Sequence, residues 1–96
     1  MDTSKNKPGK IQDLIDNKFL EERKIYLWGM VNDKTAKHVI DRLEYLDLMG
    51  DSEIQLFINS PGGYVTDGFA IYDTIMSIKS PVSTICTGLA ASMGSI

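Results

Sequence analysis

Ser92 stands in a segment of small residues, GLAASMG, at positions 88–94. A serine on a sharp turn from a strand into a helix, among neighbours with little side chain, can present its hydroxyl to a carbonyl as a nucleophile. The N–H of Met93 would then lie in the first helical turn, where no helical carbonyl accepts it, and it could donate to a developing oxyanion. The alternative is a serine that only caps a helix, since Ala90 replaces the first glycine of the usual G-x-S-x-G pattern.

A second loop of unusual composition is SPGG, at positions 60–63. Glycine adopts backbone angles closed to other residues and lets the backbone approach a ligand, so Gly62 and Gly63 indicate a binding loop. An N–H from this loop could donate to the same oxyanion as the N–H of Met93. Two such donors beside a serine are typical of an acyl-transfer site. The alternative is a plain tight turn; the glycine spacing matches neither common phosphate-binding motif.

The rest of the sequence predicts strands and helices that alternate along the chain, with each of the two loops after a strand. Short apolar runs predict strands at 24–31, 53–59 and 82–88. Helices are predicted at 11–22, from Asn32-Asp33 to a cap at Gly50, from a cap at Thr66 or Asp67 to Ser80-Pro81, and from Leu89 onward. Their apolar faces are expected at Ile11, Leu14, Ile15 and Phe19, then at Ala36, Val39, Ile40, Leu43 and Leu46, and then at Phe69, Tyr72, Ile75 and Met76.

This order predicts an α/β fold with parallel strands and right-handed crossovers. In such folds binding sites form in the loops that leave the carboxyl ends of the strands. The SPGG and GLAASMG loops both leave strands in this way. We therefore expect them to meet at the same edge of the sheet.

Composition limits the remaining possibilities. The chain has 96 residues, enough for one domain at most, and residues 1–10 are expected to be a mobile tail. A net charge of −3 argues against a nucleic-acid partner. A single cysteine fits a cytoplasmic protein, and neither a signal peptide nor an apolar run long enough for a membrane span is apparent.

Several residues are expected to have structural roles only. Cys86 is predicted to be a buried, inert thiol, and Tyr26 and Trp28 are predicted to be packing residues. The charge run at 21–24 is expected to be a solvated face. The only histidine, His38, is predicted to lie on the surface of a helix.

The motifs together resemble the proteolytic subunit of the Clp protease, ClpP. The resemblance runs over about residues 13–96 and rests on INSPGG at 58–63, IYDT at 71–74, STIC at 83–86 and GLAASMG. It implies a ClpP/crotonase-like fold of β-α-β repeats, with residues 11–96 as the N-terminal part of a Clp-type peptidase domain. It also implies a serine endopeptidase of ATP-dependent proteolysis.

The resemblance assigns roles to particular residues. It implies that Ser92 is the nucleophile and that the N–H groups of Gly63 and Met93 form the oxyanion hole. It implies that Tyr64-Val65, after Gly63, pairs with the substrate backbone as an added strand. The implied partners are other Clp subunits in two stacked seven-membered rings, a Clp-family ring ATPase and unfolded polypeptides, without a metal or other cofactor. The ATPase-docking groove is expected to include Gln55, Phe57 and Ser77.

A serine nucleophile needs a base, and the sequence before Ser92 offers none in a suitable place. In the resembled family the triad histidine and aspartate follow the serine, so neither His38 nor Asp13, Asp16, Asp33, Asp41 or Asp73 corresponds to them. The ending after Ile96 is therefore interpreted as a truncation at the start of a helix, and residues 1–96 alone are expected to be inactive. Two alternatives stay open: a non-catalytic Clp-like ring subunit and, more distantly, a crotonase-type acyl-CoA enzyme.

Overall fold

Helices and parallel strands alternate along the chain in the computed structural model, which describes residues 8–86. The elements are α1 (Pro8–Glu21), β1 (Lys24–Trp28), α2 (Asp33–Met49), β2 (Ile54–Asn59), α3 (Val65–Ser77) and β3 (Val82–Cys86). Both strand pairs are parallel, and the described sheet has the order β1-β2-β3. The predicted α/β class with parallel strands is confirmed.

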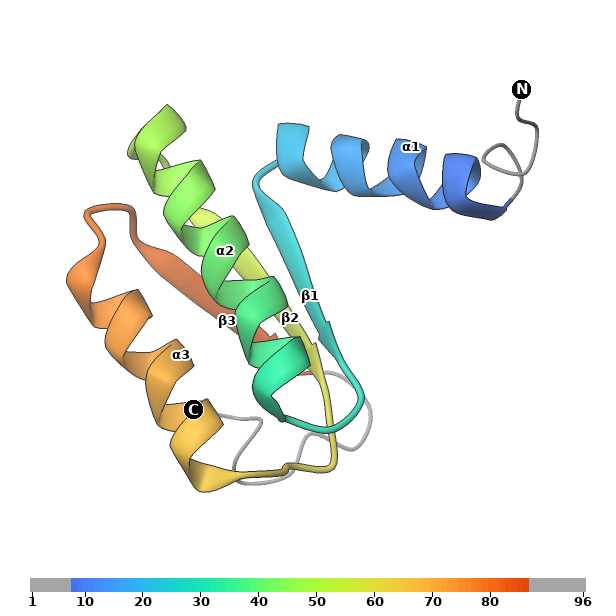
Figure 1. The fold of residues 1–96 in the computed structure, drawn as a ribbon. Coiled ribbons are helices and arrows are strands. Elements are labelled where there is room, and N and C mark those ends of the chain that lie inside the picture. Colours follow the sequence, from blue (N-terminus) through green and yellow to red (C-terminus); the bar gives the residue numbers. More distant parts are fainter. Residues whose placement is uncertain (1–7, 87–96) are drawn as a thin grey trace.

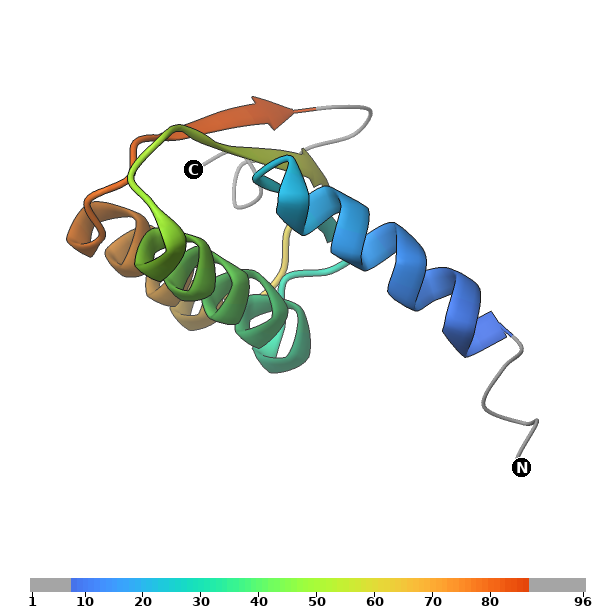
Figure 2. The same ribbon diagram turned by 90° about the horizontal axis from the view of Figure 1, so that it is seen from above.

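Two helices cover one face of the sheet. Figure 1 shows α2 and α3 side by side across the strands, and Figure 2 shows both on the same side of the sheet. Helix α1 instead extends outward from the start of β1 (Figure 2). Because all three strands run the same way, their carboxyl ends meet at one edge of the sheet.

The core lies between the sheet and α2. Alternate strand residues point toward it, because successive side chains of a strand lie on opposite faces. The buried apolar residues are Ile25, Leu27, Val31, Ala36, Val39, Leu43, Leu46, Ile54, Leu56, Ile58 and Ile71. The apolar face predicted for the second helix is therefore confirmed, although Ile40 is only half-buried.

The ends of α2 also follow the prediction. Asn32 caps the helix: its side chain accepts hydrogen bonds from the N–H groups of Lys34 and Thr35, both at 3.0 Å. The hydroxyl of Thr35 accepts from the N–H of Asn32 at 2.9 Å, which completes a reciprocal capping box. Gly50 is the C-cap, as expected.

The first helix differs from the prediction in two ways. It begins at Pro8, so residues 8–10, which were expected to belong to a mobile tail, are helical. Proline suits a first helical turn because its nitrogen needs no acceptor there. Ile11 and Leu14 are exposed because α1 projects past the sheet; contact with the core comes from Leu20 instead.

The third helix is rotated relative to the predicted apolar face. Gly68 and Ile71 are its buried residues, whereas Phe69 and Met76 are exposed by 58% and 65%. Ile75 of the predicted face does pack against the core, but the buried Ile71 lies one position, about 100° around a helix, from the predicted Tyr72. The predicted caps are also wrong, because α3 begins at Val65 and no side chain caps it.

Edge strands explain two further corrections. Trp28 is 67% exposed, not a packing residue, because it ends the edge strand β1. Cys86 is likewise exposed, not buried, at the end of β3, the other edge of the described sheet. Tyr26 does pack: its ring stacks on Phe19 and on Phe57, with centroids 4.7 and 4.8 Å apart.

Candidate active site

The SPGG loop leaves the carboxyl end of β2 and is held from within by a buried serine. Ser60 has no exposed surface. Its hydroxyl accepts from the N–H of Gly62 at 3.0 Å and donates to the carbonyl of Gly62 at 3.2 Å. The first glycine of the loop therefore has both of its backbone polar groups bound to one side chain. Gly62 has a φ of 110°, a backbone angle that residues with a Cβ rarely adopt.

Gly63 pairs with the loop that follows β1. The N–H of Val31 donates to the carbonyl of Gly62 at 2.9 Å, and the N–H of Tyr64 donates to the carbonyl of Val31 at 2.8 Å. These bonds form a parallel bridge between Val31 and Gly63. In such a bridge Val31 uses both of its own backbone groups, so the N–H and carbonyl of Gly63 point to the opposite side. No acceptor for the Gly63 N–H exists among residues 8–86.

The need for glycine at position 63 comes from this pairing. A Cβ built on Gly63 would lie 2.1 Å from the carbonyl oxygen of Val31 and 2.6 Å from its nitrogen. Both atoms belong to the backbone, so they cannot move aside without breaking the bridge. The expected approach of this backbone to a ligand stays a prediction; within the described residues, the group that comes close to Gly63 is the backbone of Val31.

The loop that carries Val31 is fixed by the cap of α2. Gly29, with a φ of 90°, turns the chain out of β1, and its N–H donates to the carbonyl of Asn59 at 3.1 Å. The hydroxyl of Thr35 donates to the carbonyl of Met30 at 2.7 Å while it accepts from Asn32. The residues before and after Val31 are thus bound to the side chain of Thr35, which restrains the backbone of Val31 where it pairs with Gly63.

Tyr64 and Val65 connect the SPGG loop to α3. Val65 is the first residue of α3, and Tyr64 is its N-cap, with an extended backbone. The N–H of Val65 lies in the first helical turn, where no helical carbonyl accepts it, so the pairing of Tyr64-Val65 with a substrate stays a prediction. Both side chains are exposed, by 63% and 53%, next to the outward-facing backbone of Gly63.

Ser92 and Met93 lie outside the described residues, so their roles stay predictions. His38 lies on α2, at a separate cavity of about 180 Å³ that Asp16 of α1 and Trp28 of β1 also line. Partial burial, and then the charge of Arg42, lower the pKa of His38 below its usual value of 6.5. Its position as a surface helix histidine is confirmed.

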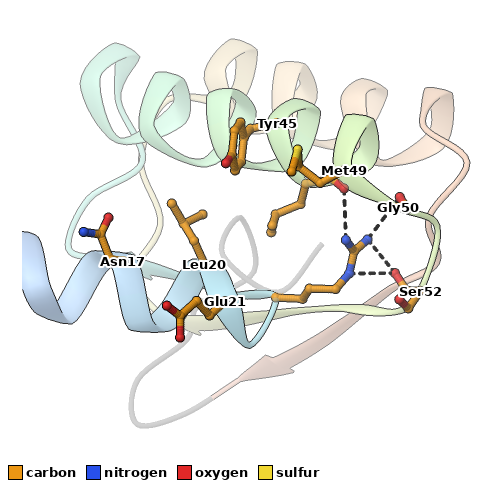
Figure 3. Close-up of a pocket in the computed structure, with 9 residues that line it drawn as sticks. Asn17, Leu20, Glu21, Tyr45, Met49, Gly50 and Ser52 are labelled. Carbon is orange, nitrogen blue, oxygen red and sulfur yellow. Dashed lines mark hydrogen bonds between the residues drawn. The ribbon is translucent and has the colours of Figure 1, made fainter.

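The structure adds a polar cluster that the sequence did not reveal. Arg23, within the expected solvated charge run, donates to the carbonyls of Leu46, Gly50, Ser52 and Glu53 and to the hydroxyl of Ser80, at 2.7–3.4 Å. Figure 3 shows the bonds to Leu46, Gly50 and Ser52 beside a cavity of about 560 Å³ between α1 and α2. The expected solvated face is therefore wrong for Arg23, whose partners lie 23 to 57 positions away.

Asp47 completes this cluster at the amino end of the sheet. One of its oxygens accepts from the N–H of Ser80 at 2.9 Å, from the hydroxyl of Ser80 at 2.9 Å and from the N–H of Lys79 at 3.1 Å. The hydrogen bond from the Ser80 N–H is the main reason why the pKa of Asp47 is lowered. Because these groups lie at the strand starts, the cluster is structural and does not face the SPGG loop.

Residues 8–86 contain no group of three histidine, cysteine, aspartate or glutamate side chains placed to hold a metal ion. Of their helices, none combines the length and the apolar character that crossing a membrane demands.

Comparison with known proteins identifies the family. A family model described as Clp protease matches residues 7–96. The ATP-dependent Clp protease proteolytic subunit 1 of Chlamydia muridarum is 50% identical over 88 residues, which cover 91% of this chain and 46% of that protein. The ATP-dependent Clp protease proteolytic subunit of Carsonella ruddii is 50% identical over 80 residues, which cover 83% of this chain and 41% of that protein.

A solved structure has the same fold. The ClpP protease catalytic domain from Plasmodium falciparum matches with a TM-score of 0.83 and 43% identity, over 88% of this chain and 46% of that chain. The chain thus spans about half the length of the relatives that it matches. Since the family model matches nearly all of its residues and the fold agrees, the chain belongs to the Clp protease family.

Proposed function

We propose that the protein acts in ATP-dependent Clp proteolysis as a serine endopeptidase subunit that cleaves unfolded polypeptides by acyl transfer. One observation carries the proposal: the N–H of Gly63 points outward, without an acceptor among residues 8–86, at the sheet edge where such folds bind ligands. A backbone donor held in this way suits an oxyanion, because it needs no reorganisation when the charge develops.

The proposed reaction follows the serine peptidase scheme. Ser92 attacks the peptide carbonyl, and its proton passes to a histidine base. The carbonyl oxygen gains a negative charge, which the N–H groups of Gly63 and Met93 stabilise. The base then protonates the leaving amine, and water releases the acyl group from Ser92. The proposed base is a histidine outside residues 1–96 and not His38, which lines a cavity between α1, β1 and α2.

Substrate binding is proposed at the outward backbone edge of Gly63. Its N–H and carbonyl face away from Val31 and can pair with an extended chain, a recognition mode that depends little on substrate sequence. The exposed side chains of Tyr64 and Val65 would then contact the substrate beside this edge. We also propose that the backbone of Tyr64-Val65 pairs with the substrate, since Tyr64 is extended and the N–H of Val65, the first residue of α3, has no helical acceptor.

The proposed partners are further Clp subunits, in two stacked rings of seven, and a Clp-family ring ATPase. For the ATPase we propose the outer face of the sheet, where the stacked rings of Tyr26 and Phe57 lie. Gln55 lies on the same face as Phe57, two residues away in β2, and Ser77 ends α3. The names of the relatives support ATP dependence, and a cytoplasmic location is proposed with it.

The test is covalent labelling of Ser92 in the full-length protein. A fluorophosphonate should label wild type, and Ser92→Ala should abolish both labelling and hydrolysis of a fluorogenic peptide. Ser52→Ala, which changes an exposed serine whose side chain makes none of the described hydrogen bonds, is the matched control and should be labelled like wild type. Persistent labelling of Ser92→Ala would show another nucleophile. An assembled protein that is neither labelled nor active would indicate the non-catalytic subunit.

A further inference from the structure

The orientation of the Gly63 N–H depends on one peptide plane. The N–H of Gly63 and the carbonyl of Gly62 belong to the same planar, trans peptide unit, so they point in opposite directions. Whatever holds the Gly62 carbonyl therefore also aims the Gly63 N–H. In the structure two donors hold this carbonyl, the N–H of Val31 at 2.9 Å and the hydroxyl of Ser60 at 3.2 Å.

We propose that Ser60 is a positioning residue for the oxyanion donor of Gly63, an inference that rests on the proposed function. The hydroxyl of Ser60 binds the Gly62 carbonyl on one side and the Gly62 N–H on the other. It thus fixes two successive peptide planes of the loop. Because Ser60 is completely buried, water cannot replace its hydroxyl at either place.

A loop with two adjacent glycines needs such a restraint. A peptide plane between two glycines can rotate at low cost, since neither residue has a Cβ that opposes the rotated form. A rotated plane would exchange the positions of the carbonyl and the N–H. A carbonyl dipole would then face the oxyanion, and the N–H would face Val31. Ser60 disfavours this rotation, because rotation of this plane would take the Gly62 carbonyl away from the buried hydroxyl, which would keep only the bond from the Gly62 N–H.

The direct test is Ser60→Ala in the assembled, full-length protein. We expect kcat per titrated active site to fall by about 10- to 100-fold, less than the roughly 10²–10³ lost when an oxyanion donor is removed. KM should change little, because the donor acts on charge that develops in the transition state. Affinity for a peptide boronate, whose tetrahedral adduct places an oxygen in the oxyanion position, should fall in proportion to kcat.

Ser80→Ala is the matched control. Ser80 is also a buried serine with a hydrogen-bonded hydroxyl, but it lies at the amino end of the sheet. This variant should unfold at a lower temperature and keep wild-type kcat per titrated site. A purely structural role for Ser60 predicts the same behaviour for Ser60→Ala, so unchanged kcat and boronate affinity in that variant would overturn the inference.

Thr35→Val keeps the inference testable if Ser60→Ala does not assemble. Thr35 holds the residues on both sides of Val31, the second donor to the Gly62 carbonyl. A parallel loss of kcat and boronate affinity, smaller than for Ser60→Ala, is expected, and wild-type values for both would overturn the inference. Failure of the proposed function has a different signature, because either the wild-type protein would be inactive or Ser92→Ala would stay active, whatever the Ser60 variant does.

Discussion

The two ends of the sheet are held in different ways. At the amino end, charged side chains join distant segments: Arg23 reaches Leu46 and Ser80, and Asp47 binds the start of β3. At the carboxyl end, Ser60 bonds to the residue two positions later, and backbone groups make the bridge to Val31. The amino end ties segments together, whereas the carboxyl end leaves the N–H of Gly63 without an acceptor among residues 8–86. One end stabilises the fold, and at the other we propose that the Gly63 N–H serves as a donor to a ligand.

Gly63→Ala should have the largest effect, because it disrupts the carboxyl end directly. The new Cβ would overlap the backbone of Val31, so the bridge must open and the donor must move. In the full-length protein, kcat should fall by at least roughly 10²-fold. Gly29→Ala is the control: its backbone angle is unfavourable, but nothing lies within 4 Å of its Cβ. Similar activities for the two variants would contradict the assigned role of the Val31 bridge.

Arg23→Ala should affect the amino end strongly and the reaction little. Removing the guanidinium leaves carbonyls at the end of α2 and the start of β2 without their charged donor. We expect a loss of about 1–3 kcal/mol in the free energy of unfolding. Denaturant unfolding measures this loss, while kcat per titrated site should remain near wild type. Arg23→Lys should recover only part of it, since one ammonium cannot reach all these acceptors. A fall in kcat without loss of stability would show that the two ends are coupled.

Asn32→Ala should have an intermediate effect, and it should lower both the stability of the fold and the rate of peptide hydrolysis. It removes the N-cap of α2, which costs about 1 kcal/mol of stability. It also loosens the loop that carries Val31, so kcat should fall slightly. Thermal unfolding and peptide hydrolysis on the same preparation measure both effects. Asn32→Asp retains the side-chain acceptor and should restore most of the stability; equal losses in the two variants would contradict the capping role.

The smallest expected effect is the pH dependence contributed by Asp47. Its pKa lies below the usual 3.8, chiefly because of the hydrogen bond from the Ser80 N–H. A lowered pKa favours the folded state above about pH 4, and this contribution is lost as the pH falls through the pKa of the folded state. Asp47→Asn should therefore show a smaller drop in stability below pH 4 than wild type. Identical pH profiles from denaturant unfolding at pH 2–6 would contradict this assignment.

Local pattern was sufficient for much of the fold. Strand β2 alternates buried and half-buried residues, as its sequence IQLFIN suggests, and α2 carries both its cap at Asn32 and its apolar stripe in the sequence. The site loop was also recognisable, since two adjacent glycines after a strand are uncommon without a reason in the backbone. These features depend on neighbours within a few positions, which a sequence displays directly.

The buried faces of α1 and α3 could not be predicted from such local patterns. Both helices carry apolar residues on more than one side, so periodicity alone could not select the buried side. In α3 the contact with the core selected Ile71, one position from the predicted stripe. The exposure of Trp28 and Cys86 likewise followed from the position of their strands at the sheet edges, which depends on the strand order.

By itself the sequence determined the α/β class, the capped helix α2, the membership of the Clp protease family and the glycine loop after β2. Only the tertiary structure decided why Gly63 must be glycine and which side chains hold the two ends of the sheet. The physical reason is separation along the chain: Gly63 meets Val31, and Arg23 meets Ser80, only after the strands have paired. No local pattern of residues encodes such a contact, because its geometry exists only in the folded sheet.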